Sequence, residues 1–591
     1  MRAKVLRLAA AIIAVTITSP FTSPPSAMAQ AQPPVTLKVA IVQQIDSLNP
    51  FIAVFQSSTE VGRLMYDYLT AYAQADQKVV EGVAKTWEPS PGKLTWTFTV
   101  PDGKKWSDGK PLTARDVAFT YNLMLTNEVA RTANGSFVAN FESVTATDDR
   151  TVVVKTKAPQ ITMTALDVPI VPQHVWESVT DIKNYANDQV PVVGSGPFVL
   201  TEYKAGEYIK LKANRSYWRG AAKYDELHFV YFKNADAAVQ ALAKGEVDLV
   251  NRMAPAQFDS LADKENVTRN KAQGRRFNEL LINPGAQTRT GTPIGDGNPA
   301  LRDVRVRRAI ARAIDLDALV KRVNAGYAEV GTGIIPPVFP KYHWEPSAAE
   351  RRTFDAAAAK AELDAAGYPP KDGVRLSLRL LGRAGRAYDE QASEYLKQSL
   401  ADIGIKIDVQ LVSDDQLNQT TTAATYDLAF SGWGTNVDPD FILGLHTCGQ
   451  RPGADGTGGT TDSYFCDAEY DRLYAQQLSE FDEAKRVEIV KAMQARFYDQ
   501  VPSVVLCYEN ALEAYRSDRF SRFPVQPQTG GVIMAQNGVW GYYGAEPAAQ
   551  SASSGSGRSW LGIAAGGVVV LVAAGGWFVA RRRRATAEER E

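Results

Sequence analysis

Apolar and polar residues alternate most regularly in the third quarter of the chain. Every second residue is apolar over 374–380 and again over 405–411, which predicts two half-buried strands. Between them, apolar residues recur at helical spacing over 392–403 and the pattern stops at Gly404, which predicts a helix with a glycine beyond its end. A strand, a helix and a strand in this order are typical of a βαβ unit with parallel strands.

A second helix is predicted over 414–424, followed by an apolar strand over 426–430. In open α/β sheets, ligands bind beyond the carboxyl ends of the parallel strands. The loops that follow two of the predicted strands, 382–386 and 431–440, are therefore expected to face one cleft. Apolar stripes at helical spacing predict three further helices, at 306–314, 354–366 and 487–497.

A strand, a turn and a helix start follow one another in the region 82–121. Residues 94–100 alternate as a half-buried strand does, and Pro101-Asp102-Gly103 predicts a turn. Thr113 with Asp116 three residues later has the pattern of a capping box, which predicts that a helix begins here. The region is therefore expected to form a hairpin that leads into a capped helix.

The same region carries three short motifs in order: Thr-Trp-Glu-Pro at 86–89, Trp-Ser-Asp-Gly-Lys-Pro-Leu-Thr-Ala at 106–114 and Asp-Val-Ala-Phe-Thr at 116–120. Val-Gly-Ser-Gly-Pro-Phe follows at 193–198. In order and spacing, these motifs resemble the signature of the bacterial extracellular solute-binding proteins of family 5, the peptide-binding receptors of ABC importers. The resemblance covers roughly residues 36 to 545.

The resemblance implies an α/β, type II periplasmic-binding-protein fold, with two lobes around a cleft and an extra subdomain in the first lobe. It implies a receptor that captures peptides in this cleft and delivers them to the membrane permease of an ABC transporter. Neither catalysis nor a cofactor is implied. The implied boundaries are lobe I at 36–72, 192–285 and 507–545, the extra subdomain at 73–191, and lobe II at 286–506.

Both ends of the chain carry the patterns of targeting segments. Basic residues and an apolar run precede Ala27-Met28-Ala29, which predicts a signal peptide over 1–29 that is cleaved near Ala29. No charged residue occurs in 560–580 and four arginines follow, which predicts a transmembrane helix with a cytoplasmic tail at 581–591. A buried helix is the alternative for this run, although it has no polar face. A linker over 546–559 would join the membrane helix to an extracellular body.

Composition narrows the class of function further. The chain has 591 residues, more than one hydrophobic core usually supports, so two or more lobes are expected. Its 65 Lys and Arg nearly balance its 66 Asp and Glu, and no basic stripe is present that would predict nucleic-acid binding. We expect a monomer that binds a peptide or another small molecule and contacts permease subunits.

The sequence does not favour an enzyme. It has four histidines and lacks the His-Glu-x-x-His, Gly-x-Ser-x-Gly and phosphate-binding Gly-x-x-x-x-Gly-Lys-Ser/Thr motifs. A hydrolase that uses paired carboxylates is the remaining enzymatic alternative, since any chain with this many acidic residues brings some of them together. Two non-enzymatic roles are also compatible with the fold: a receptor for oligosaccharides or metal chelates, and a surface receptor that senses peptides.

Two of the three cysteines, Cys448 and Cys466, flank a glycine-rich loop and are expected to form a disulfide in an oxidising compartment. Cys507 lies in an apolar strand-like run and is expected to be a free, buried thiol. The alternative is a metal site made by the first two cysteines and His446, but no fourth ligand lies near them in the sequence. We therefore expect no metal.

Five residues in the two predicted cleft loops are candidates for ligand binding. Arg383 and Arg386 offer guanidinium groups to a carboxylate, while Asn436 and Asp438 offer oxygens to an amine and Trp433 an apolar wall. The loop resembles the family motif in which an acid shortly after the tryptophan takes the α-amino group of the peptide, but Asn436 stands about where that acid is expected. Solvated arginines, a core tryptophan and a simple Asp-Pro turn would explain the same residues without a ligand.

Overall fold

The computed structural model describes residues 33–454, 461 and 463–549. The predicted signal peptide, transmembrane helix and cytoplasmic tail lie outside these residues, as does most of the predicted linker. Within the described part of the chain, no helix is both long and apolar enough to cross a membrane.

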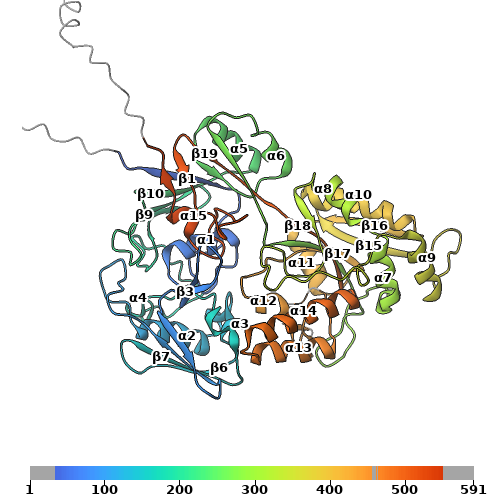
Figure 1. The fold of residues 1–591 in the computed structure, drawn as a ribbon, viewed down its shortest axis with the longest axis horizontal. Coiled ribbons are helices and arrows are strands. Elements are labelled where there is room, and N and C mark those ends of the chain that lie inside the picture. The colour runs from blue at the N-terminus through green and yellow to red at the C-terminus, as the bar shows by residue number, and fades with distance from the viewer. Residues whose placement is uncertain (1–32, 455–460, 462, 550–591) are drawn as a thin grey trace, which may run out of the picture.

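The first of two large sheets forms the centre of lobe I, at the upper left of Figure 1. Its seven strands lie in the order β12-β19-β11-β1-β10-β9-β8, in which β1 is parallel to both of its neighbours. The inward side chains of the central strand β1, such as Leu37 and Val39, are fully buried. The strands are β1 (Thr36–Ile41), β8 (Phe198–Lys204), β9 (Tyr208–Ala213), β10 (Glu226–Tyr231), β11 (Leu249–Val250), β12 (Val267–Ala272) and β19 (Ala511–Arg516).

Short helices and two small two-stranded sheets complete lobe I. The sheet β20-β21 includes Glu546–Pro547, so the first residues of the predicted linker belong to the folded body. The helices are α1 (Gln56–Met65), α5 (Ala235–Lys244), α6 (Pro255–Asp259) and α15 (Trp540–Tyr543), and the strands of the small sheets are β2 (Thr70–Tyr72), β3 (Val79–Glu81), β20 (Phe520–Arg522) and β21 (Glu546–Pro547).

An extra subdomain with a four-stranded sheet of order β4-β5-β7-β6 lies below lobe I in Figure 1. The predicted capping box is present at the start of α2: the Thr113 N–H donates to Oδ2 of Asp116 at 2.8 Å. Trp96 and Phe98 are buried, as the alternation predicts. The elements are β4 (Thr86–Pro89), β5 (Thr95–Thr99), β6 (Phe141–Ala146), β7 (Thr151–Thr156), α2 (Ala114–Thr126), η1 (Val129–Arg131), α3 (Gly135–Val138), η2 (Ile161–Thr164) and α4 (Gln173–Trp176).

The second large sheet forms the centre of lobe II, on the right of Figure 1. Its six strands lie in the order β14-β18-β13-β17-β15-β16. The predicted βαβ unit is confirmed, because β15 is parallel to β16 through the intervening α10, and β15 is also parallel to β17. The strands are β13 (Phe277–Ile282), β14 (Ala328–Val330), β15 (Leu376–Arg383), β16 (Ile405–Val412), β17 (Leu428–Ser431) and β18 (Ser503–Glu509).

The helices of lobe II pack around this sheet, and the stripes predicted from the sequence form α7, α9 and α14. Gly404, just beyond α10, has a φ of +83°, a conformation that glycine adopts without strain. The helices are α7 (Val304–Arg312), α8 (Leu316–Val323), α9 (Ala356–Ala365), α10 (Ala387–Ala401), α11 (Asp414–Thr422), α12 (Asp440–Gly444), α13 (Ala468–Ser479) and α14 (Glu483–Gln500), with the short η3 (Pro299–Arg302) and η4 (Cys448–Gln450).

Two extended segments cross between the lobes. Residues 273–276 connect β12 to β13, and Asn510 connects β18 to β19. At Gly274 an added Cβ would lie 1.8 Å from the Glu509 carbonyl oxygen, so only glycine allows the segments to come this close. The predicted lobe boundaries lie after residues 285 and 506. In the structure lobe II begins earlier and ends later, because β13 and β18 both pair within the lobe II sheet.

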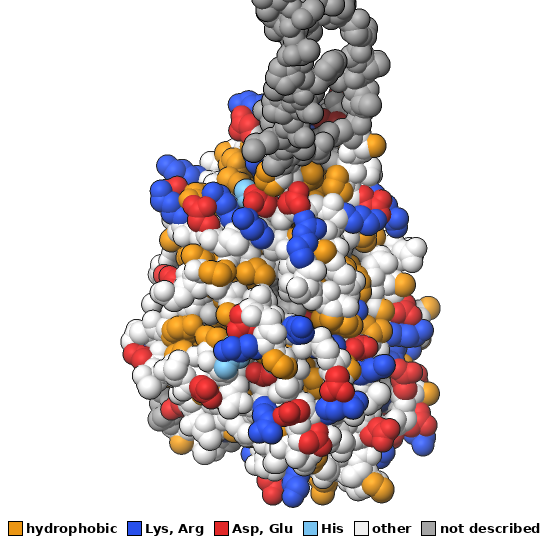
Figure 2. All heavy atoms as spheres, turned by 90° about the vertical axis from the view of Figure 1, so that its left-hand side faces the viewer, with side chains coloured by type: hydrophobic (Ala, Val, Ile, Leu, Met, Phe, Trp, Pro, Cys, Tyr) orange, Lys and Arg blue, Asp and Glu red, His pale blue; other side chains and the backbone are white. Residues whose placement is uncertain are grey.

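On the side away from these crossings, lobe II also touches the extra subdomain. The ring of Phe481, between α13 and α14, stacks on Trp96 of β5 with 6.1 Å between centroids. The ammonium group of Lys93 lies 4.7 Å from the centroid of the same Phe481 ring. The space between the lobes is therefore bounded by the crossings on one side and by this contact on the other (Figure 1). On the face shown in Figure 2, basic and acidic side chains are intermixed.

Candidate ligand-binding site

The carboxyl ends of β15 and β17 border one cavity of about 320 Å³. Arg383 lines it from the end of β15 and Ser431 from the end of β17, and Gly432 and Trp433 line it from the loop after β17. Arg276 of the first crossing completes this side, and its Nη2 donates to the Gly432 carbonyl oxygen at 2.7 Å. The structure thus brings the two predicted loops together, with Arg383 and Trp433 among the residues that line the cavity.

The two predicted carboxylate-binding arginines already contact carboxylates of the protein. Arg383 lies 2.9 Å from Asp414 and 3.5 Å from Asp389, measured between guanidinium nitrogen and carboxylate oxygen. Arg386 lies 3.3 Å from the same Asp389 and 3.8 Å from Glu509. Asp389 is fully buried and also accepts the Arg383 backbone N–H. A ligand carboxylate would therefore have to compete with these acids.

Trp433 packs against the lobe II core and also lines the lobe II cavity. Its ring meets that of Phe441 edge to face, with 6.1 Å between centroids, and it packs against the lobe II core. The loop is held to the first crossing by the backbone: Phe277 N–H donates to the Trp433 carbonyl at 3.1 Å, and Thr435 N–H donates to the Arg275 carbonyl at 2.9 Å. The tryptophan is therefore fixed at the point where the crossing enters lobe II.

Asp438 points to a partner within lobe II. Its two carboxylate oxygens accept from Nη1 and Nη2 of Arg486 on α14, at 2.7 and 2.9 Å. Burial raises the pKa of Asp438, but the charge and hydrogen bonds of Arg486 outweigh burial, and the pKa lies below its usual value. Burial and the Asp438 charge raise the pKa of the adjacent Asp440 to about 6. The oxygens that the sequence offers to a ligand amine are thus engaged by an arginine.

Asn436 lies beside a cation that the sequence analysis missed. Its Oδ1 accepts from Nη1 of Arg275 at 3.1 Å, and the same nitrogen lies 3.4 Å from Oδ1 of Asn537, in lobe I. Burial, followed by repulsion from Arg63, lowers the pKa of Arg275 to about 10. The only signal in the sequence is the pair of arginines after Gly274, between a mostly polar strand at 267–272 and a buried strand at 277–282.

Lobe I contributes a second, smaller cavity of about 60 Å³ that the sequence analysis also missed. Arg63 on its wall pairs with Asp167, with its Nη2 at 2.5 Å from each carboxylate oxygen, and lies over the Tyr68 ring at 4.6 Å. Asn537 and Trp540 line the same cavity. Its walls therefore combine aromatic rings with a charge pair that is already neutralised.

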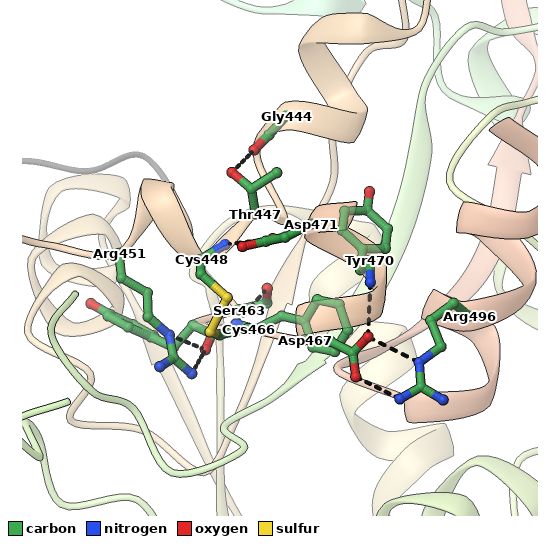
Figure 3. Close-up of a disulfide and its surroundings, with 12 residues drawn as sticks. Gly444, Thr447, Cys448, Arg451, Ser463, Cys466, Asp467, Tyr470, Asp471 and Arg496 are labelled. Carbon is green, nitrogen blue, oxygen red and sulfur yellow. Dashed lines mark hydrogen bonds and ion pairs between the residues drawn. A yellow bond between two sulfur atoms is a disulfide. The ribbon is translucent and has the colours of Figure 1, made fainter. Parts of the chain in front are cut away.

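Cys448 and Cys466 form the predicted disulfide in lobe II (Figure 3). Asp471 accepts the Cys448 N–H at 3.0 Å, and Arg451 donates to the Tyr464 carbonyl (Figure 3). Cys507 is free and fully buried, and burial raises the pKa of its thiol to about 12. Within the described residues no three His, Cys, Asp or Glu side chains come together as a metal site.

Two α/β lobes joined by two crossing segments, with a cavity in each lobe, are the fold of a solute-binding protein of the type II periplasmic class. The fold matches that of the oligopeptide-binding protein AppA from Bacillus subtilis in complex with a nonapeptide, with a TM-score of 0.71, 22% identity and coverage of 87% of this chain and 99% of that chain. It also matches NikZ from Campylobacter jejuni in complex with Ni(L-His), with a TM-score of 0.73, 20% identity and coverage of 87% and 100%. The predicted fold class is confirmed.

Residues 78–452 match the middle region of the bacterial extracellular solute-binding proteins, family 5, and the chain belongs to this family. The sequence is 26% identical to the oligopeptide-binding protein AppA of Bacillus subtilis over 493 residues, which cover 80% of this chain and 86% of that protein. The resemblance seen in the motifs therefore extends over most of the described body.

Proposed function

We propose that the protein is the exported receptor of an ABC importer, which captures peptides between its lobes and delivers them to a membrane permease. Membership of the solute-binding family supports the receptor role, and relatives named as oligopeptide-binding and dipeptide-binding proteins support peptides as the ligand class. The observation that carries the proposal is the geometry: loops from two parallel strands of lobe II share a cavity with the crossing that joins the lobes.

The lobe II wall of the proposed site is formed by the loops after β15 and β17. Trp433 and Arg383 line the cavity there, and the backbone of the Trp433 loop is held to the first crossing. Asp438 is proposed to hold this loop through Arg486. The lobe I wall is the aromatic cavity around Trp540, so a peptide would lie between these aromatic rings and a lobe II wall made by Trp433 and polar side chains.

The proposed receptor is attached to the membrane by residues 560–580, with its body outside the cell. The uncharged run and the four arginines that follow it support this arrangement. The strand β21 ends at Pro547, which leaves 548–559 as the proposed tether. A flexible chain of this length spans about 20 Å, enough for the body to reorient above a permease.

The proposal is tested by the small molecules that the protein retains. The protein is purified from its native host without denaturation, its ligands are released by acid, and they are identified by mass spectrometry. Peptides that rebind to the stripped protein in calorimetry would support the proposal. Retention of sugars or metal chelates, with no binding of peptides, would refute it. Loss of uptake of the same isotope-labelled peptide on deletion of the receptor gene tests delivery.

A further inference from the structure

Arg275 is a cation in the crossing between the lobes that forms no direct ion pair with any described residue, although Asp167 and Glu60 act on it from a greater distance. Its Nη1 donates to Asn436 of lobe II at 3.1 Å and reaches Asn537 of lobe I at 3.4 Å, and both acceptors are neutral amide oxygens. Its Nε is buried and, among the described residues, has no hydrogen-bond partner. No Asp or Glu in the described part of the chain lies within ion-pair distance of this guanidinium.

The carboxylates nearest to this region are engaged by other arginines. Asp167 is held by Arg63 at 2.5 Å to both oxygens. Glu60 lies 3.1 Å from Arg252 and accepts a hydrogen bond from the Tyr542 hydroxyl at 2.8 Å. Each of these pairs is neutral as a whole, so the guanidinium of Arg275 remains as a surplus positive charge.

A buried surplus charge is unfavourable unless another group compensates it. Burial lowers the pKa of Arg275 to about 10; repulsion from Arg63, Arg276 and Arg252 acts in the same direction, and attraction to Asp167 opposes it without outweighing it. Even with this shift the side chain is charged at neutral pH. An anion supplied by a ligand would remove the imbalance, and a guanidinium matches the two oxygens of a carboxylate geometrically.

Arg275 is partly buried, and it lies next to residues that line the two cavities. Asn537, which Arg275 contacts, lines the lobe I cavity together with Trp540. The next residue, Arg276, lines the lobe II cavity with Trp433. Successive residues of an extended segment face opposite sides, so Arg276 faces the lobe II cavity while Arg275 faces Asn537 on the wall of the lobe I cavity.

We infer that Arg275 is the specificity-determining residue of the interlobe site, and that it selects ligands which place a carboxylate beside Asn436 and Asn537. The inference rests on the proposed function, because it concerns the ligand of the same site. For a peptide, the group would be the carboxylate at its C-terminus. An α-amino group at this position would place two cations side by side, so the Trp433 loop is not the amine site that its family motif suggests.

The test compares three forms of one probe, the tripeptide Ala-Ala-Ala: free termini, N-acetylated, and C-amidated. Calorimetry on the ligand-stripped, full-length protein should show similar affinity for the first two and at least thirtyfold weaker binding of the amide. Arg275→Gln should lose this preference while its melting temperature stays equal or rises, because it removes an uncompensated charge. The matched control is Arg115→Gln on the surface, where the side chain is 66% exposed. This variant should keep both the preference for the free carboxylate and the melting temperature of the wild type.

A second variant, Asn436→Asp, keeps the shape of the side chain and supplies an internal anion where Nη1 of Arg275 is already 3.1 Å away. We expect a higher melting temperature and at least tenfold weaker binding of the free and acetylated tripeptides. If the variant instead binds the free-amine form more tightly and the acetylated form no better, the loop is an amine site and the inference is wrong.

The outcomes separate this inference from the proposed function. Equal binding of the amide and the free acid by the wild type supports peptide capture and overturns the role of Arg275. If no tripeptide binds, the molecules that the purified protein retains are compared between the wild type and Arg275→Gln. A non-peptide carboxylate that only the wild type retains supports the inference and refutes peptide capture. Retention of neutral molecules, or of nothing at all, overturns the inference.

Discussion

Replacement of Asp438 by Asn tests whether this residue holds the Trp433 loop or binds the ligand. Both oxygens of Asp438 accept from Arg486, whose guanidinium also donates to Gln477 and Tyr342. The side chains of the pair are 16% and 5% exposed. The substitution keeps the shape of Asp438 but removes the carboxylate that is hydrogen-bonded to the buried guanidinium of Arg486, and leaves Asp440 as the nearby anion that acts on it.

The expected loss of stability follows from this burial. Removing one partner of a buried ion pair costs about 3–5 kcal/mol. The entropy of unfolding is about 2.1 cal/mol/K per residue, so about 500 residues that unfold as one unit contribute about 1 kcal/mol/K. The melting temperature should then fall by about 3–5 °C. If lobe II, with about 230 residues, unfolds separately, the fall should be about 6–10 °C.

Differential scanning calorimetry measures this shift, and Asp149→Asn provides the control. Asp149 pairs with Arg115 at 2.6 Å, but both side chains are more than 60% exposed. Such surface pairs contribute about 0–1 kcal/mol, so the control should shift the melting temperature by about 1 °C or less. If Asp438→Asn melts like the control but binds peptide at least thirtyfold more weakly, Asp438 is a ligand-binding residue and our reasoning is refuted.

Three further predictions concern other parts of the chain. Truncation after Gly557 should release a folded, soluble protein into the medium, and retention of this variant on the membrane would contradict the proposed anchor. Thiol titration of denatured, unreduced protein should find one reactive group, Cys507, whereas three would exclude the disulfide between Cys448 and Cys466. His446 is buried, and its ring nitrogens have no hydrogen-bond partner in the described residues. Burial lowers its pKa to about 3, so the unfolded chain binds the proton more tightly and stability falls as the pH drops below about 6.5. Between pH 7.5 and pH 5 the wild type should lose about 2 kcal/mol more than His446→Leu in urea unfolding, and equal losses would contradict this.

Local patterns in the sequence predicted the parts of the fold that local forces determine. The strands and helix of the βαβ unit were found because alternation and helical spacing report which face of each element is buried. The capping box at Thr113 was found because its partners are three residues apart. The boundary at β13 was missed because all residues of Phe277–Ile282 are buried, so no alternation shows which sheet the strand joins.

The chemistry between the lobes could not be predicted in the same way. Arg275 contacts residues that are 161 and 262 positions away in the sequence, and an arginine in a short connecting segment usually points to solvent. The partner of Asp438 is 48 positions away, on a helix whose apolar stripe was the only feature visible in the sequence. Which charged residues form ion pairs depends on packing between segments that are distant in the sequence. The sequence alone therefore does not show which charges are paired.

The position of Arg275 also links ligand binding to the arrangement of the lobes. Its two neutral partners belong to different lobes, Asn436 to lobe II and Asn537 to lobe I, so the environment that would receive a carboxylate exists only when the lobes are close. A ligand anion that binds here interacts more strongly with the closed state than with an open one, and it shifts the equilibrium by that difference in affinity. A ligand amine at the same place would oppose closure. One arginine in the crossing would therefore both select the ligand and couple its capture to closure, without an acid in the Trp433 loop.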